Sequence, residues 1–425
     1  MPVATKPFRP LLNSAGFLSM PHGKATWRSG YAADCKSVHT GSIPVVASRL
    51  PERRGWGLRR VGIGIIGCGS ISGQYLTAAK AFPVLDVRAV ADIDPAAAER
   101  RGAEFGVPAS GIAELLADPA VEIVLNLTIP AAHVAVGRQV VAAGKHVYSE
   151  KPLGTDFAEA AAFVAEAERR GLRVGCAPDT FLGGSHQTAR AWIDAGHLGA
   201  PVGGTAFFMC PGHERWHPNP DFYYKAGGGP MLDMGPYYLT DLVNLLGPVA
   251  RVAGMAPAPR PTRTITSAPR AGEVIEVEVP THVAGSLQFR SGAVVSVITS
   301  FDVPGHRHLP IEIYGTEASL LVPDPNWFGG EVSALAKGGE WTAVSVELPW
   351  TDANYRSLGL ADMAAAIVQG RPHRASGALA LHVLEVMEAF GRSAESGQFI
   401  DIATCPERPA PLSESGPLDR LEETA

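Results

Sequence analysis

Three side chains that can handle protons recur every four residues in the stretch GGGPMLDMGPYYLTD, residues 227–241. They are Asp233, Tyr237 and Asp241. Because residues four apart share one face of an α-helix, a helix through this stretch stacks two carboxylates and a phenol. A phenol, whose usual pKa is about 10, can donate a proton to a developing alkoxide. The spacing therefore makes Asp233 and Tyr237 candidates for proton chemistry, whereas Asp241, two turns deeper, is expected to be structural.

Glycine and proline mark the two ends of this predicted helix. Residues 227–229 form a glycine loop, Pro230 suits a first helical turn, and Gly247 with the proline after it ends the helix. Two simpler interpretations stay open. Asp233 interacts only with the positive end of the helix dipole, or Tyr237 is a core tyrosine with a satisfied hydroxyl.

A buried strand followed by a glycine turn lies near residue 60. The apolar run Val61–Ile66 predicts the strand, and a helix-compatible stretch begins at about residue 70. Gly67 permits a tight turn, Gly69 lets a pyrophosphate approach the backbone, and the helix start supplies free N–H groups. Ser72 replaces the third glycine of the G-x-G-x-x-G pattern, so the motif alone is weak evidence. The residues expected to contact a dinucleotide here are Gly67, Gly69, Ser70 and Ile71.

An acidic residue ends the second predicted strand, VLDVRAVADID. Asp92 lies at the offset where a carboxylate accepts hydrogen bonds from the ribose hydroxyls of a dinucleotide. Ile93 follows it in place of an arginine, so a 2′-phosphate would meet a negative charge without a cation. NAD is therefore expected rather than NADP. The alternative is that Asp92 only caps the helix near Pro95, but Asp94 is better placed for that and would leave Asp92 free.

Strands and helices alternate through the next hundred residues. The expected strands are 121–129, 146–152 and 172–177, and the helices between them lie at about 131–144 and 156–170. This alternation predicts a parallel, doubly wound α/β sheet whose ligand site lies at the carboxyl ends of its strands. The residues at those ends are Asn126, Thr128, Glu150 and Lys151.

Composition limits the partners of the chain. It has 425 residues, a formal net charge of −6 and 46% hydrophobic residues, which suits a globular protein of about two domains. No dense basic stripe indicates a nucleic acid or a membrane surface, so a small molecule is the expected partner. The five cysteines show neither C-x-x-C spacing nor an even framework. We expect a reducing, cytoplasmic setting without a metal site.

Residues 1–59 differ from the rest of the chain. Many basic residues are opposed there only by Asp34 and Glu52, and no sustained apolar periodicity is present. We expect a disordered extension without a secretory signal, because no uninterrupted apolar segment follows the basic start. A misassigned start codon and a real transit or regulatory extension are both open.

The glycine loop GCGSIS, the stretch NLTIPAAHVAVGRQVVAAGKHVYSEKPLG and the stretch GGGPMLDMGPYYLTD together resemble the glucose-fructose oxidoreductase, inositol dehydrogenase and MocA (Gfo/Idh/MocA) family. The resemblance covers about residues 60–400, and Glu150-Lys151-Pro152 is its most specific part. It implies a Rossmann domain, a C-terminal α/β domain with an open, mostly antiparallel sheet, and a homodimer or homotetramer formed through that sheet. The expected divisions are 1–59, 60–178, 179–405 and a tail at 406–425, and strand-like segments from 251 to 345 support the second sheet.

The resemblance also implies the catalytic group Lys151, Asp233 and Tyr237. Family members place a histidine four residues after the aspartate, where this chain has Tyr237, although some relatives carry tyrosine there. The implied reaction is hydride transfer between a nicotinamide and a secondary carbinol carbon of a sugar, cyclitol or glycoside. Lys151 and Tyr237 would share the proton, and Asp233 would orient the hydroxyl or Lys151. Burial is expected to lower the pKa of Lys151, and which of the two is the primary acid or base is open.

Two loops are the expected source of substrate specificity. The stretches PDTFLGGSHQ (178–187) and PGHERWHPNPDFYYK (211–225) carry the candidates Asp179, His213, Trp216 and His217. Hydrogen bonds to sugar hydroxyls and stacking of Trp216 are expected rather than a metal site, because no second ligand cluster completes a shell. Pro130 and His133 are expected to support the cofactor loop.

Three functions compete. The first is an NAD-dependent dehydrogenase or reductase that releases its cofactor. The second is an enzyme that retains NAD and uses transient oxidation, either to exchange hydride between sugars or to cleave a glycosidic bond. The third is a non-catalytic regulator that senses NAD on the same fold.

Overall fold

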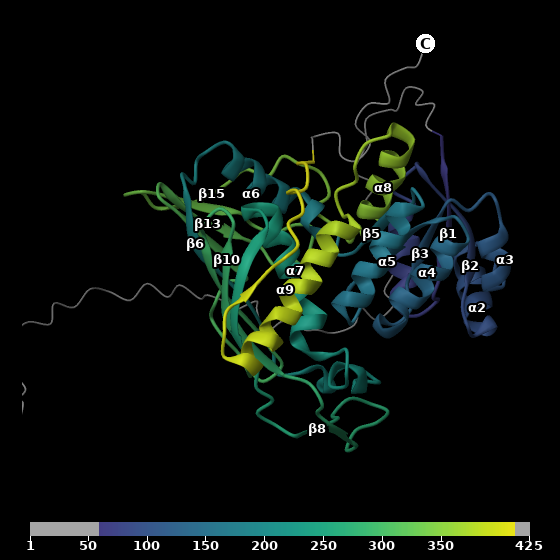
Figure 1. Cartoon of the computed structure of the whole chain (residues 1–425), viewed down its shortest axis with the longest axis horizontal. Helices are drawn as coiled ribbons and strands as arrows, with labels where there is room; N and C mark the ends of the chain where they lie inside the picture. Colours follow the sequence, from purple (N-terminus) through teal and green to yellow (C-terminus); the bar gives the residue numbers. More distant parts are fainter. Residues whose placement is uncertain (1–58, 413–425) are drawn as a thin grey trace, which may run out of the picture. The chain divides into compact units, whose positions relative to one another are not determined.

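The computed structural model describes residues 59–412, which all belong to one compact unit. The predicted N-terminal extension lies outside the described residues except for Arg59, and so does the predicted tail beyond residue 412. Figure 1 shows two groups of elements, each built around a sheet.

The first sheet is parallel and has the strand order β2-β1-β3-β4-β5. Its strands are β1 (Val61–Ile66), β2 (Leu85–Ala91), β3 (Ile123–Asn126), β4 (His146–Ser149) and β5 (Val174–Cys176). The helices that connect them are α1 (Ser72–Ala79), α2 (Pro95–Phe105), α3 (Ile112–Ala117), α4 (His133–Ala142) and α5 (Phe157–Arg169). The order reverses between β1 and β3, which is where open α/β sheets bind ligands.

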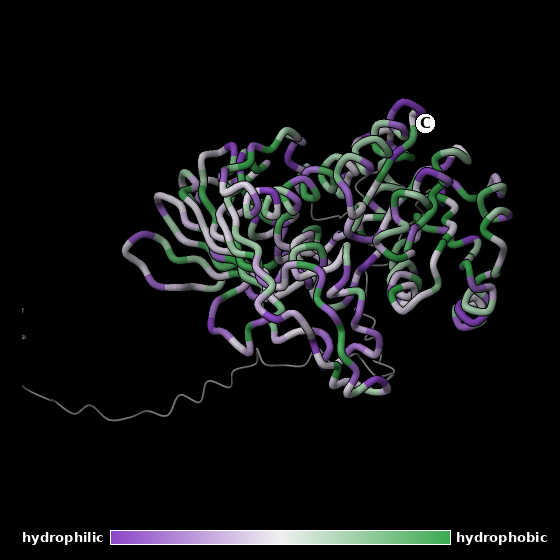
Figure 2. The backbone as a smooth tube through the Cα atoms, turned by 60° about the horizontal axis from the view of Figure 1, so that its bottom comes forward, coloured by the Kyte–Doolittle hydropathy of each residue, from purple (hydrophilic) through white to green (hydrophobic). Residues whose placement is uncertain are grey.

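Both faces of this sheet are covered, which explains its almost uninterrupted apolar strands. Ile63 and Ile65 of β1 pack in one cluster with Leu76 of α1. Val124 of β3 packs in the other cluster with residues of α4 and α5, including Phe163. Figure 2 shows that hydrophobic residues follow the strands and that hydrophilic residues gather on the outer loops and helices. The predicted doubly wound sheet is confirmed.

The second sheet is open and has nine strands in the order β15-β14-β13-β12-β6-β11-β10-β7-β16. Only the pair of β6 and β11 is parallel, so the predicted mostly antiparallel sheet is confirmed. The strands are β6 (Pro201–Met209), β7 (Val249–Met255), β10 (His282–Phe289), β11 (Val294–Ser300), β12 (Ile311–Gly315), β13 (Ala318–Val322), β14 (Ser333–Ala336), β15 (Trp341–Ala343) and β16 (Ile400–Asp401). A separate hairpin joins β8 (Thr262–Thr264) and β9 (Val274–Glu276).

Two long helices pack against this sheet. They are α7 (Gly229–Leu246) and α9 (Gly377–Ser396), which contact each other and, between them, β6, β7, β10 and β11. Pro230 occupies the first turn of α7, as predicted, and Pro236 lies inside the helix without ending it. Leu242 of α7 and Leu384 of α9 belong to the same buried cluster, which packs α7 against the sheet. The packing of α7 positions Asp233 and Tyr237.

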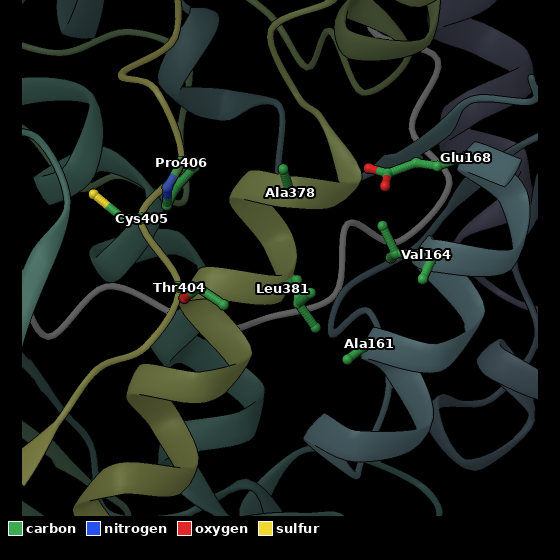
Figure 3. A pocket seen from close by; sticks show the side chains of 9 residues that line it. Ala161, Val164, Glu168, Ala378, Leu381, Thr404, Cys405 and Pro406 are labelled. Carbon is green, nitrogen blue, oxygen red and sulfur yellow. The ribbon is translucent and has the colours of Figure 1, made fainter.

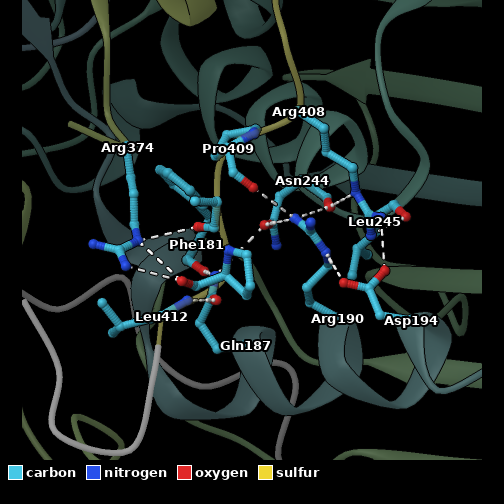
Figure 4. Close-up of polar contacts among 12 residues, drawn as sticks. Phe181, Gln187, Arg190, Asp194, Asn244, Leu245, Arg374, Arg408, Pro409 and Leu412 are labelled. Carbon is cyan, nitrogen blue, oxygen red and sulfur yellow. Dashed lines mark hydrogen bonds and ion pairs between the residues drawn. The ribbon is translucent and has the colours of Figure 1, made fainter. Parts of the chain in front are cut away.

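The last part of the described chain returns to the first sheet and also secures the second. Helix α8 (Leu358–Gln369) contacts α1 and β5, and Cys176 N–H donates to Ala375 O (3.1 Å). Figure 4 shows how the C-terminal segment is held against α6 (Gly184–Asp194) and α7. Arg190 Nη1 donates to Asn244 O (2.9 Å) and to Pro409 O (3.1 Å). Within residues 59–412, no helix is both long enough and apolar enough to span a membrane.

Candidate functional site

The glycine turn after β1 leaves open space on one side only. Gly67 has a φ of +104°, and a Cβ there would lie 2.6 Å from the backbone of Leu127. Only glycine fits that position without strain. A Cβ on Gly69, by contrast, would meet nothing within 4 Å, and Gly69 and Ser70 are exposed. The turn therefore packs tightly on its inner side and offers free backbone beside the start of α1, with Ile71 as the helix N-cap. That cradle fits a dinucleotide pyrophosphate.

Asp92 is less free than the sequence suggests. Its Oδ2 accepts from Cys68 N–H (2.7 Å) and its Oδ1 accepts from Asp94 N–H (2.9 Å). Asp94 caps α2 through Ala96 N–H (3.1 Å), as predicted. Asp92 thus ties the glycine turn to the end of β2. Each carboxylate oxygen has a second lone pair, and the side chain remains half-buried, so a ribose hydroxyl can still donate to it.

Two arginines that the sequence analysis did not single out lie beside this turn. A pocket of about 210 Å³ is lined by Cys68, Ala97, Arg100, Arg101 and Glu104. Arg101 Nη2 donates to Gly69 O (3.1 Å), so it braces the loop from the side of α2. The nearby cations weaken the expectation that a 2′-phosphate would meet only negative charge. The sequence did contain a signal for these cations, because both arginines lie between one and two helical turns after Asp94, the residue that caps the helix.

Asn126, Thr128 and His133 form one network at the end of β3. Asn126 Oδ1 accepts from Thr128 Oγ1–H (2.7 Å), and its Nδ2 donates to His133 O (3.0 Å). The His133 ring lies between Pro152 O (2.7 Å from Nδ1) and Thr128 O (3.0 Å from Nε2). Pro130 begins the short 3-10 turn Pro130–Ala132 between them. His133 thus joins the end of β3 to the segment after β4.

Glu150 positions the backbone of Lys151, the candidate catalytic lysine. Its Oε1 accepts from Tyr75 Oη–H (2.8 Å) and its Oε2 accepts from Lys151 N–H (2.8 Å). Both carboxylate oxygens are therefore used inside the protein, and the side chain is buried. Glu150 fixes the backbone of Lys151 at the carboxyl end of β4, from which the lysine side chain reaches toward α7.

Lys151, Asp233 and His213 meet in one continuous chain of contacts. Lys151 Nζ donates to Asp233 Oδ1 (2.9 Å) and to Asp233 O (2.7 Å). The other carboxylate oxygen, Oδ2, lies 3.1 Å from His213 Nε2. Trp216 Nε1–H donates to His213 Nδ1 (3.1 Å). Because Nδ1 accepts, the neutral imidazole carries its proton on Nε2 and donates it to Asp233.

The charged groups in this series of contacts stabilise one another in their ionised forms. Burial lowers the pKa of Lys151, but the Asp233 carboxylate, with Tyr237 and Glu150, outweighs burial and holds that pKa well above its usual range. Burial likewise raises the pKa of Asp233, while the Lys151 ammonium and His213 bring it well below its usual range. The expectation that the pKa of Lys151 falls is therefore wrong. Its partner carboxylate lies in contact, so the lysine stays protonated at neutral pH.

Tyr237 lies between two cations. Lys151 Nζ is 5.1 Å from the centroid of its ring, and Arg356 Nη2 is 3.5 Å from its hydroxyl oxygen. The ring is almost fully buried, with 6% exposure. The sequence analysis missed Arg356, which precedes α8 and lies 119 positions from Tyr237. No local pattern around Arg356 marks it, because only the fold brings it to α7.

Two other predicted residues are used inside the protein. Asp179, predicted to bind substrate, is 1% exposed, and its Oδ2 accepts from Ser357 N–H (3.2 Å) and Gly359 N–H (2.9 Å) at the start of α8. Burial raises its pKa to about 6. These contacts describe a helix cap rather than a group facing a ligand. Asp241, predicted to be structural, accepts from buried His186 (2.8 Å).

The loop that carries His213 is anchored by a buried polar network. Glu214 accepts hydrogen bonds from Tyr224 Oη–H and from Arg263 Nη1 (3.2 Å). Arg263 Nη2 in turn donates to Asp302 Oδ1 (2.6 Å) at the end of β11. Trp216 and His217 remain partly exposed beyond this anchor, and burial lowers the pKa of His217. The network explains how a proline- and glycine-rich loop holds His213 at a fixed distance from Asp233.

A second pocket lies away from these residues. It has a volume of about 290 Å³ and lies between α5, α9 and the segment around Cys405 (Figure 3). None of the predicted site residues lines it.

Two family models match the chain. Residues 61–177 match the NAD-binding Rossmann fold of the oxidoreductase family, and residues 186–321 match the GFO/IDH/MocA C-terminal domain. The chain belongs to the GFO/IDH/MocA family. The resemblance recognised from the sequence is confirmed, and at the level of the family so is the prediction of an oxidoreductase.

Several named relatives of this GFO/IDH/MocA chain are sugar reductases or dehydrogenases, and others are trans-1,2-dihydrobenzene-1,2-diol dehydrogenases. It is 26% identical to a 1,5-anhydro-D-fructose reductase of Ensifer adhaerens over 71% of this chain and 85% of that one. It is 26% identical to an NADP-dependent D-xylose 1-dehydrogenase of Haloferax volcanii over 80% of this chain and 99% of that one. It is 33% identical to a dTDP-3,4-didehydro-2,6-dideoxy-alpha-D-glucose 3-reductase of Saccharopolyspora spinosa, but over 42% of this chain and only 53% of that relative.

Solved structures show the same fold. An NAD-binding oxidoreductase of Klebsiella pneumoniae superposes with a TM-score of 0.71 at 24% identity and covers 81% of this chain and 99% of that one. Levoglucosan dehydrogenase in complex with NADH and L-sorbose gives a TM-score of 0.73 at 19% identity, with coverage of 82% and 100%.

Proposed function

We propose that the chain is an NAD-dependent oxidoreductase that interconverts a secondary alcohol and a ketone on a sugar, cyclitol or glycoside. The observation that carries this proposal is the meeting of Lys151 with Asp233. Lys151 follows the carboxyl end of β4, which belongs to the same sheet as β1, the strand before the glycine turn. Asp233 comes from α7, which packs against the second sheet. The 2.9 Å contact therefore joins the edge of the first sheet where a cofactor would bind to the polar side chains of α7.

Each residue of this group has a separate proposed role. Bound NAD would supply the hydride acceptor. Lys151, kept protonated by Asp233, donates a hydrogen bond to the reacting oxygen and does not accept its proton. We propose that Tyr237 exchanges that proton through its hydroxyl, which makes Tyr237 rather than Lys151 the primary acid or base of this mechanism. Asp233, held on both oxygens, keeps Lys151 in place.

The proposed role of His213 differs from the one expected from the sequence. Its Nε2–H is already directed at Asp233, and its Nδ1 accepts from Trp216. We propose that His213 fixes Asp233 and that Trp216 and His217, which stay partly exposed, face the substrate. Asp179 is not part of this proposal, because its carboxylate caps α8.

We propose NAD as the cofactor because Asp92 presents a half-buried carboxylate where a 2′-phosphate would lie. Arg100 and Arg101 favour the opposite choice, and relatives include an NADP-dependent dehydrogenase as well as structures with NADH. The sugar-like substrate class is supported by relatives that are sugar reductases and dehydrogenases.

We also propose a domain division, an oligomeric state and a cellular setting. The division into domains at 60–178 and 179–405 is supported by the two separate sheets. A homodimer or homotetramer is supported by exposed apolar side chains on strands of the second sheet, such as Val202, Met255 and Val294. A reducing, cytoplasmic setting is supported by Cys68, Cys176 and Cys405, which are thiols rather than disulfides.

The test is an absorbance assay for reduced nicotinamide. The purified protein is incubated with aldoses, inositols and simple glycosides, with NAD and NADP in separate reactions. Lys151→Ala is the test variant, and Lys337→Ala, at an exposed lysine after β14, is the matched control. Turnover that disappears only in Lys151→Ala supports the proposal. Equal turnover in Lys151→Ala contradicts it, and NAD released by denaturing an inactive protein would instead favour an enzyme that retains its cofactor, or a sensor.

A further inference from the structure

Arg356 is an arginine held in place entirely by neutral groups. Its Nη1 donates to Asn354 Oδ1 (3.1 Å), and its Nη2 donates to Asn326 Oδ1 (2.8 Å). The same Nη2 lies 3.4 Å from Asn326 O and 3.5 Å from the Tyr237 hydroxyl oxygen. The guanidinium carbon is 6.0 Å from the centroid of the Tyr237 ring. The side chain is thus aimed at the proposed catalytic tyrosine.

The guanidinium has donors to spare. Arginine carries five N–H groups, and the contacts above use those of Nη2 and one of Nη1. Among residues 59–412, no acceptor contacts Nε or the second N–H of Nη1. Within the same residues, no nitrogen of Arg356 is both fully buried and unbonded. The unpaired Nε–H therefore faces space that solvent, or a ligand, can reach.

The charge of Arg356 also lacks a direct partner. In the described part of the chain no carboxylate forms an ion pair with it, whereas Lys151 has Asp233. Glu150, Asp179 and Asp324 act on it only from a longer distance. Each of these is engaged elsewhere: Glu150 by Tyr75, Asp179 by the start of α8, and Asp324 by Asn326 N–H. Partly buried charges usually have a direct counter-charge, so this one is unusual.

We propose that Arg356 binds an anionic group of the substrate, so that the proposed oxidoreductase acts on a sugar or cyclitol carrying a carboxylate or a phosphate ester. This inference rests on the proposed function, because it places the anionic group beside the reacting carbon near Tyr237. A guanidinium suits both anions, since its planar donors match carboxylate and phosphate oxygens. Asn326 and Asn354 hold it ready without neutralising it, which a carboxylate in their place would do.

The neighbouring backbone shows that this position is built rather than accidental. Ser357, the next residue, has a φ of +150°, a conformation that is costly without glycine. It is held there because its N–H donates to Asp179 and its Oγ–H donates to Tyr75 O (3.0 Å). Asn354 Nδ2 donates to Gln74 Oε1 (2.7 Å) on α1. These contacts tie the segment with Arg356 to the first sheet's helix and direct the side chain toward α7.

The experiment compares charged sugars with their neutral parents on the NAD-loaded protein. Binding of D-glucuronate, D-galacturonate and D-glucose 6-phosphate is measured by calorimetry against D-glucose and D-galactose, at constant ionic strength. The kcat/KM for each sugar is measured in parallel. Arg356→Met is the test variant, Arg356→Lys retains the charge, and Arg169→Met, at an exposed arginine in the last turn of α5, is the matched control.

We expect at least one anionic sugar to bind more tightly than its neutral parent. Arg356→Met should weaken that binding about 10- to 100-fold, leave the neutral sugars within about threefold, and retain NAD binding. Arg356→Lys should recover part of the loss. A comparison of the uronates with the phosphate ester shows whether the substrate's anionic group is a carboxylate or a phosphate.

The proposal is overturned if no anionic sugar binds more tightly than its parent, or if Arg356→Met weakens charged and neutral sugars equally. A failure of the proposed function looks different. Selective anion binding that depends on Arg356, without turnover of any sugar, would support the anion site and contradict the oxidoreductase. Turnover of the neutral sugars alone would do the reverse.

Discussion

The two halves of the site are built in different ways. The half around the glycine turn uses mostly backbone: Gly67 fits against Leu127, Gly69 faces open space, and Asp92 holds Cys68 N–H. The half around α7 uses side chains that come from distant segments, with Lys151 meeting Asp233 across 82 positions and Arg356 meeting Tyr237 across 119. A cofactor common to many reactions needs a constant cradle, whereas a substrate needs groups that vary from one protein to another.

The comparison predicts different outcomes for substitutions in the two halves. Loss of the Tyr237 hydroxyl on α7 should remove activity and leave the fold, whereas changes at the glycine turn should disturb the fold itself.

Removing the phenol hydroxyl gives the largest expected effect. Tyr237→Phe should lower kcat about 10²- to 10⁴-fold, because the group proposed to exchange the substrate proton is lost. The ring stays, so its packing and its contact with Lys151 are retained. Steady-state kinetics measure the effect, and thermal unfolding with NAD binding serves as control. A kcat within threefold of the original would remove Tyr237 from the proposed mechanism.

Adding a methyl group to the glycine turn should destabilise the protein. Gly67→Ala places a Cβ 2.6 Å from Leu127 at a φ of +104°, so both strain and overlap apply. We expect a loss of about 2–4 kcal/mol in the free energy of unfolding, measured with urea. Gly144→Ala is the control, since Gly144 has a φ of +75° but open space around it, and should lose about 1 kcal/mol. Equal losses would show that overlap at Leu127 is unimportant.

The pH dependence of stability should report the Lys151–Asp233 pair. The pKa of Lys151 is raised, so its contribution is full below the unfolded value of 10.5 and is lost as pH rises beyond it. The pKa of Asp233 is lowered, so its contribution is full above the unfolded value of 3.8 and is lost as pH falls below it. The pair therefore contributes constantly between about pH 5 and pH 10.

Asp233→Asn tests this window. Urea unfolding across the pH range should show a constant difference in the free energy of unfolding between the original chain and the variant from about pH 5 to pH 10. That difference should shrink at both extremes. A difference that already shrinks near neutral pH would mean that Lys151 loses its proton there, as the sequence-based expectation held.

The smallest expected effect is at the support of His213. Trp216→Phe removes the indole N–H that donates to His213 Nδ1, so the ring is free to change tautomer or rotate. One neutral hydrogen bond contributes about 1 kcal/mol, so kcat/KM should fall about fivefold. Trp192→Phe on α6 is the matched control. A change in KM alone would indicate that the proposed substrate contact of Trp216, and not its hydrogen bond to His213, causes the effect.

Local patterns predicted most of the first half. The strand expected at Val61–Ile66 is β1 with the same bounds, and the helix expected at 156–170 is α5 at Phe157–Arg169. Both follow from short-range causes: an apolar run fills a buried strand, and Asp156 caps a helix that ends before Gly171 at a φ of +69°. The same reasoning identified Asp94 as a cap and the glycine turn as a cradle.

The sequence by itself thus determined the parallel sheet, the glycine turn, the helix that carries Asp233 and Tyr237, and the family. Only the tertiary structure decided which groups meet on that helix. It paired Asp233 with His213, turned Asp179 into a cap, brought Arg356 to Tyr237 and raised the pKa of Lys151 where burial alone would lower it. Helix and strand periodicity act over a few residues, whereas charge pairing depends on distances in space, which the fold sets.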